Sequence, residues 1–186
     1  MDFVTLAAAW KNKEKVPVPY FGSKKVELYF EDEEHLQESA PALLRFFSLT
    51  TADRDASSHH AYAYFRDFAD EVGFDEGWIE LAMEKLTEAS PAIWDFVYPG
   101  EISAKRAWDF GKRDVFAIYV VANAECGWEE EHGFQMSWRN GVDVARVGDH
   151  GHATNGHAYN DPAKDAFVYY SHNAPYCTRN PLFPKD

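Results

Sequence analysis

The chain has 186 residues, of which 46% are hydrophobic and 16% aromatic, and it carries a formal net charge of −13. This composition is typical of a folded globular protein and excludes a disordered chain. No apolar run approaches the ~20 residues of a membrane helix, and we find no secretory signal at the N-terminus. The acidic balance disfavours nucleic acid, because nucleic-acid binders concentrate Lys and Arg. We therefore expect a cytoplasmic protein that binds neither a membrane nor nucleic acid.

The first predicted elements are two strands joined by a turn at Gly22 and Ser23, the second strand covering residues 24–30. Hydrophobic residues at alternate positions support that second strand. A run of acidic residues follows, as a solvated turn or as the negatively charged first turn of a helix. This run consists of Glu31, Asp32, Glu33 and Glu34.

Hydrophobic residues at helical spacing then predict a block of about three helices over approximately residues 35–90. Ser39 and Pro41 suit the start of the first helix, because proline is tolerated in a first turn. The expected N-caps of the other two helices are Ser57 or Ser58, and Asp75.

After Pro91 the pattern changes to strands, and Pro99-Gly100 is a turn signal between the first two of them. The predicted strands cover residues 93–98, 101–108, 115–122 and 167–170. The third of these is hydrophobic on both faces, which is typical of a central strand. The whole pattern predicts an α+β fold, with an antiparallel sheet packed against the helical block. We expect a single domain over residues 1–186.

Residues 134–147 predict a hairpin, because Asn140-Gly141 is the strongest short turn signal. In a two-residue turn Arg139 lies opposite Val142, and directly opposed side chains share a face of the sheet. One apolar surface would then hold Phe134, Met136, Trp138, Ala145 and Val147. His132 would lie beside Asp149 at the end of this surface, and Glu131 would meet His150 on the opposite face.

A histidine beside a carboxylate is compatible with general acid–base chemistry, because the carboxylate orients the ring and raises its basicity. His132 and Asp149 are therefore the candidate catalytic pair. The structural interpretation is favoured, since polar groups at the edge of a core need hydrogen-bond partners whether or not they react.

The loop after the hairpin is a second candidate site, for zinc. His150, His152 and His157 could coordinate the ion, with Asp149 or a glutamate completing a tetrahedral site. The spacing matches no standard zinc motif. The two cysteines, Cys126 and Cys177, are too few for a disulfide framework, so reduced thiols are expected, with one bridge between them as the alternative.

The stretch from Trp128 through Glu131-His132-Gly133-Phe134, the Asn140-Gly141 turn and the Val147-Gly148 close resembles a set of uncharacterised bacterial domains. Their pattern is W-x-x-E-H-G-aliphatic, a strand, a polar-Gly turn and V-G; Phe134 departs from it. These domains are similar in type to small acidic proteins encoded beside bacterial toxins. The resemblance implies an immunity role, and it brings no catalytic residues.

The leading hypothesis is a non-enzymatic acidic binding protein whose partner is a protein with a basic surface, such as a toxin that it masks. An aromatic anchor ringed by carboxylates suits a Lys/Arg-rich patch. The candidate contact residues are Trp128, Glu129, Glu130 and Glu131, with Glu31, Asp32, Glu33 and Glu34. The alternative is a metal-dependent, hydrolase-like enzyme that uses the histidine-rich loop 150–157.

Overall fold

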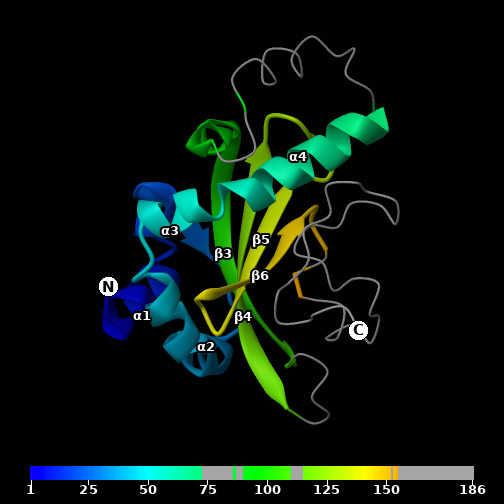
Figure 1. Cartoon of the computed structure of the whole chain (residues 1–186). Coiled ribbons are helices and arrows are strands. Elements are labelled where there is room, and N and C mark those ends of the chain that lie inside the picture. Colours follow the sequence, from blue (N-terminus) through cyan, green and yellow to red (C-terminus); the bar gives the residue numbers. More distant parts are fainter. Residues whose placement is uncertain (73–85, 87–89, 110–114, 152, 155–186) are drawn as a thin grey trace.

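The computed structural model describes residues 1–72, 86, 90–109, 115–151 and 153–154, and within them the chain forms an α+β fold (Figure 1). In chain order the elements are α1 (Phe3–Asn12), β1 (Val16–Val18), η1 (Pro19–Phe21), β2 (Lys24–Leu28), α2 (Glu33–Phe46), α3 (Thr51–Ala56), α4 (Ser58–Val72), η2 (Pro91–Phe96), β3 (Val97–Trp108), β4 (Phe116–Cys126), β5 (Phe134–Arg139) and β6 (Asp143–Gly148). Here η marks a 3-10 helix. The fold class predicted from the sequence is confirmed.

The six strands form one sheet whose spatial order follows the chain, from β1 to β6. Every neighbouring pair is antiparallel except β2 and β3, which run parallel. That pair needs a crossover, because parallel strands cannot be joined by a tight turn. The crossover contains α2, α3, α4 and η2. In Figure 1, α4 crosses the strands, whereas α1, α2 and α3 gather on the side of the N-terminus.

The predicted turn at Pro99-Gly100 is wrong. β3 runs through both residues as one strand, and its register against β4 shifts by a bulge between Pro99 and Glu101. A bulge accommodates a proline, which cannot donate to the ladder. Residues 93–96 of the strand predicted before it belong instead to the 3-10 helix η2, which begins at Pro91 with the Ser90 side chain as its cap, whereas Val97 and Tyr98 lie in β3.

The core lies between the helices and one face of the sheet. Alternate residues of the central strands point into it, for example Ala122 of β4 opposite Met136 of β5. Trp138 is the centre of an aromatic cluster: its ring centroid lies 4.9 Å from that of Tyr20 and 4.7 Å from that of Phe46. The cluster therefore joins η1, α2 and β5 in one packing unit.

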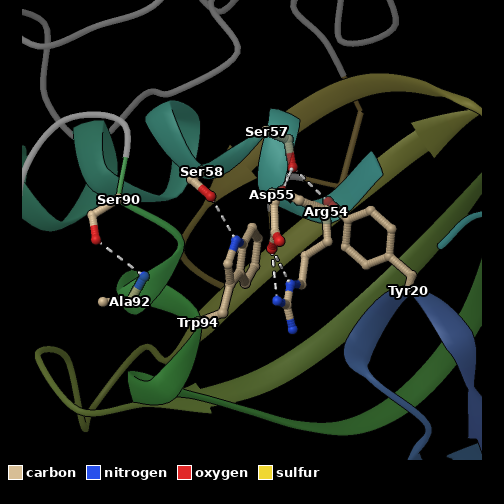
Figure 2. Close-up of polar contacts among 8 residues, drawn as sticks. All are labelled: Tyr20, Arg54, Asp55, Ser57, Ser58, Ser90, Ala92 and Trp94. Atoms are coloured by element: carbon tan, nitrogen blue, oxygen red, sulfur yellow. Dashed lines mark hydrogen bonds and ion pairs between the residues drawn. The ribbon is translucent and has the colours of Figure 1, made fainter. Parts of the chain in front are cut away.

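Buried hydroxyl groups attach the junction of α3 and α4 to the rest of the molecule (Figure 2). The Tyr20 hydroxyl lies 2.6 Å from Ser57 Oγ, and Ser57 donates to the Arg54 carbonyl at 2.8 Å. Because the only hydroxyl proton of Ser57 is used there, Tyr20 is the donor of the first bond. Burial raises the pKa of Tyr20, which keeps that proton in place. Trp94 donates to Ser58 Oγ at 2.9 Å from the other side.

The first helix of the predicted block begins earlier than expected, so the predicted start at Ser39 is wrong. The Asp32 side chain accepts from the His35 amide at 2.8 Å and caps α2, whose first turn carries the acidic residues Glu33 and Glu34. Pro41 lies inside α2 on its exposed side, where water can hydrate the carbonyl that the missing N–H leaves free.

The second predicted helix is α4, which begins at Ser58, directly after the expected cap position Ser57. Sequence reasoning missed α1, capped by Asp2, and the short α3, whose Thr50 and Asp53 form a capping box. The predicted third helix after Asp75 and the last strand, 167–170, lie outside the described residues.

The hairpin of β5 and β6 has the predicted turn residues but a different register. Asn140 and Gly141 both have positive φ, 51° and 83°, as expected. However, Arg139 pairs with Asp143, so Val142 belongs to the turn, and a bulge follows between Ser137 and Trp138. The prediction of a two-residue turn is therefore wrong.

The three-residue turn and the bulge together exchange one member of the predicted apolar surface. Val144 now lies opposite Trp138 and packs against the core, whereas Ala145 joins a small cluster with Ala117 and Tyr119. A tertiary contact accompanies this register: Arg45 of α2 donates to the Asn140 carbonyl at 2.7 Å. The turn is thus placed by α2 as well as by its own residues.

Candidate functional site

The acidic residues at the start of α2 divide into two groups. Asp32 caps the helix, and Glu33 accepts from Lys11 of α1 at 2.8 Å. Glu31 and Glu34 are exposed and form no ion pair with any described residue. Neither of these two carboxylates is used in an ion pair within the described part of the fold.

Glu31 and Glu34 line a groove between the start of α2 and β3, with a volume of about 420 Å³. We call it the acidic groove; its lining is Glu31, Asp32, Glu34, His35, Glu38, Ala104, Lys105 and Arg106. Arg106 Nε lies 3.5 Å from Glu38 Oε1, in an exposed pair that adds little stability. Among the described residues of this lining, four carboxylates accompany one lysine and one arginine.

A second hollow, of about 380 Å³, continues from the acidic groove onto the sheet face that points away from the core. It shares Glu31, His35 and Lys105 with the groove and adds Tyr29, Asn123 and Gln135. We call it the amide cavity. The two hollows therefore adjoin each other, and the lining of the amide cavity also includes apolar side chains such as Val121 and Ala153.

Two lining residues of the amide cavity, Asn123 and Gln135, belong to a ladder of hydrogen bonds across three strands, which we call the amide ladder. Asn123 Nδ2 donates to Glu101 Oε1 at 3.0 Å, and Gln135 Nε2 donates to Asn123 Oδ1 at 2.8 Å. A carboxylate only accepts, so Glu101 sets the orientation of both amides. The ladder therefore ends in the Gln135 carbonyl oxygen, which is buried and has no donor among the described residues.

Two of the predicted contact residues are buried. Trp128 is 1% exposed and packs against Tyr64 and Phe134, with ring centroids 6.0 Å from each. Glu129 is 4% exposed, and its Oε1 accepts from the amides of Glu131 and His132 at 2.9 and 3.1 Å. The expectation of a surface aromatic anchor is thus corrected, because the aromatic ring is needed in the core. Glu130 and Glu131 are exposed.

The register that placed His132 opposite Asp149 is wrong, because Met136 pairs with Val147 rather than with Ala145. The His150 amide donates to the His132 carbonyl at 3.0 Å, and His132 Nδ1 lies 3.5 Å from Glu129 Oε1. The turn and bulge described above cause the shift, because each added residue slides the two strands past each other.

His150 does not meet Glu131 across the hairpin in the predicted way. Its Nε2 atom lies 3.2 Å from the carbonyl oxygens of both Ala124 and Phe134. Such a ring, with its nitrogen among backbone oxygens, serves to hold the loop against β4 and β5.

The zinc hypothesis depends largely on residues outside the described part of the chain. His152 and His157 are among them, and in the part that is described no cluster of three His, Cys, Asp or Glu side chains is placed to hold a metal. Cys126 is a buried free thiol, and burial raises its pKa to about 12, so it stays protonated at neutral pH. Cys177 lies outside the described residues.

A larger hollow, of about 820 Å³, lies between α1 and β2. Its lining combines Trp10, Leu28 and Tyr29 with both lysines and glutamates. Two of its lining residues form an ion pair, in which Lys11 Nζ lies 2.8 Å from Glu33 Oε1. The mixed charges select no ligand class, so this hollow is the weaker candidate.

Sequence reasoning missed His35, Asn123 and Gln135. The one available signal was the alternation of β4 and β5, which places Asn123 and Gln135 on the face opposite the hydrophobic residues. Their pairing depends on strand register, which the local pattern does not give. None of the described helices has the length and apolar character to span a membrane.

The fold and the two hollows define an acidic α+β domain with a groove whose described lining residues include four carboxylates. Among families, the model described as "Domain of unknown function (DUF6985)" matches residues 2–153, and the chain belongs to this family. No curated protein matches the chain. No solved structure matches it either.

Proposed function

We propose that this chain is a non-enzymatic binding protein that holds a protein partner with a basic surface in the acidic groove. The observation that carries the proposal is the pair of exposed carboxylates, Glu31 and Glu34, which line the groove without an ion-pair partner among the described residues. A bound cation neutralises the negative charges of Glu31 and Glu34. Asp32 and Glu33, by contrast, already accept hydrogen bonds from the His35 amide and from Lys11.

The net charge of −13 supports the same proposal at longer range. A strongly acidic molecule attracts a basic partner before contact and speeds its association. The partner class is a basic toxin, which the chain masks as an immunity protein does. A toxin-like reading frame next to this gene, whose product binds the chain, is the expected biological context.

The test is a calorimetric titration of the chain with an octa-arginine peptide at about 0.05 M and about 0.5 M salt. We expect binding that weakens steeply with salt, because exposed charges are screened beyond about 10 Å at 0.1 M. Replacing both Glu31 and Glu34 by Gln should weaken binding about tenfold at low salt, since each exposed pair contributes up to about 1 kcal/mol.

The matched control is a double variant with Glu14→Gln and Glu125→Gln, which removes the same charge from exposed positions outside the acidic groove. It should retain most of the affinity. Equal losses in the two double variants would mean that net charge, not the groove, attracts the peptide. Salt-independent binding would remove the electrostatic basis of the proposal.

A further inference from the structure

The amide ladder runs from Glu101 through Asn123 to Gln135 and ends in an oxygen that has no donor within the described part of the chain. This unsatisfied acceptor indicates which chemical groups a ligand must carry. Gln135 is 7% exposed, lines the amide cavity, and carries an acceptor without a donor among the described residues. Rotating the amide by half a turn does not solve this, because Gln135 must present its NH₂ group to Asn123. A buried acceptor without a donor is costly. The Gln135 Oε1 atom itself has less than 1 Å² of exposed surface, so a bound ligand can supply the N–H or O–H donor only when this side chain turns towards the cavity.

The other walls of the amide cavity narrow the choice of donor. Glu31 supplies a carboxylate, and the Tyr29 ring is 60% exposed and accessible for stacking. Among the described residues that line this cavity, Lys105 is the one Lys or Arg side chain. An acceptor, a carboxylate and an aromatic face together suit a planar cation with several N–H groups.

We propose that the amide cavity binds the guanidinium group of an arginine side chain from the basic partner. Arginine carries five N–H donors in a flat fork, so one group can reach Gln135 and Glu31 and still stack on Tyr29. Lysine has a compact ammonium group and cannot stack in this way. This inference rests on the proposed function and adds a preference for arginine that the acidic groove alone does not create.

The first experiment compares octa-arginine with octa-lysine, which have the same charge, by calorimetry. We expect arginine to bind about tenfold more tightly, and we expect Gln135→Met to abolish that preference while lysine binding stays unchanged. Tyr29→Ala, at an exposed position, should reduce the preference severalfold. If Gln135→Met fails to fold, the Tyr29→Ala variant tests the arginine preference in its place.

The second experiment adds N-acetyl-arginine amide and follows the side-chain amide resonances of Gln135 and Asn123 by NMR. Both should shift, and N-acetyl-lysine amide should leave them in place. Equal binding of the two peptides, with neither resonance shifting, overturns the arginine site but retains the acidic groove. Failure of both peptides to bind at low salt instead overturns the proposed function.

Discussion

His60 shows how a single buried side chain couples stability to pH. It is 8% exposed in α4, and burial lowers its pKa from 6.5 to about 3. The unfolded chain takes up a proton here below about pH 6.5, whereas the folded chain stays neutral. Because the unfolded state then binds more protons, the free energy of unfolding falls as the pH drops from about 6.5 towards about 3. Above about pH 6.5 both states are neutral here, and this loss disappears.

We therefore expect the His60→Gln variant to lose part of this acid sensitivity. Between about pH 7 and about pH 5, the slope of unfolding free energy against pH should decrease by up to about 1.4 kcal/mol per pH unit. Urea unfolding at several pH values measures it. His59→Gln is the control: His59 is exposed and is only the second cause of the shift, after burial. Equal slopes in the native chain and His60→Gln would contradict the assignment.

At the scale of elements, the β5–β6 turn and α2 depend on each other. A Cβ on Gly141 would lie 1.9 Å from the Ala42 carbonyl oxygen, and Gly141 has a φ of 83°. Glycine is thus required twice, for its backbone conformation and for the close approach of α2. This docking positions the hairpin whose neighbouring strand, β4, carries Asn123 of the amide ladder.

Gly141→Ala should consequently lower the free energy of unfolding by about 3 kcal/mol or more, because backbone strain and overpacking add. Gly151→Ala is the matched control. Gly151 also has positive φ, 106°, but nothing lies within 4 Å of a Cβ built there. It should cost only about 1 kcal/mol of strain. Urea unfolding of both variants measures the difference, and similar costs would show that α2 does not constrain the turn.

At the scale of the whole molecule, the charge of −13 opposes compaction, because like charges repel one another in the folded state. Exposed ion pairs such as Lys11 with Glu33 offset little of this repulsion. We expect the melting temperature to rise as sodium chloride increases from about 0.01 M to about 0.2 M, since screening weakens the repulsion. Calorimetric scans measure the shift. A melting temperature that falls with salt would mean that ion pairs outweigh the repulsion.

Local sequence determined the fold class, the hydrophobic central strand and the left-handed conformation of Asn140 and Gly141. Each depends on residue periodicity or on φ preferences, which act over a few neighbouring positions. The same information failed for the start of α2, because both Ser39 and Asp32 suit a helix start and only the folded chain shows which one caps.

The acidic run predicted Glu31 and Glu34, but only the tertiary structure decided which other residues form the site. Trp128 and Glu129 look like surface residues in an acidic run, yet packing against Tyr64 and hydrogen bonds within the loop bury them. The register that joins Asn123 to Gln135 depends on pairing between separate strands. The physical reason is that burial and partner choice arise from segments far apart in the chain, whereas propensity and periodicity are local.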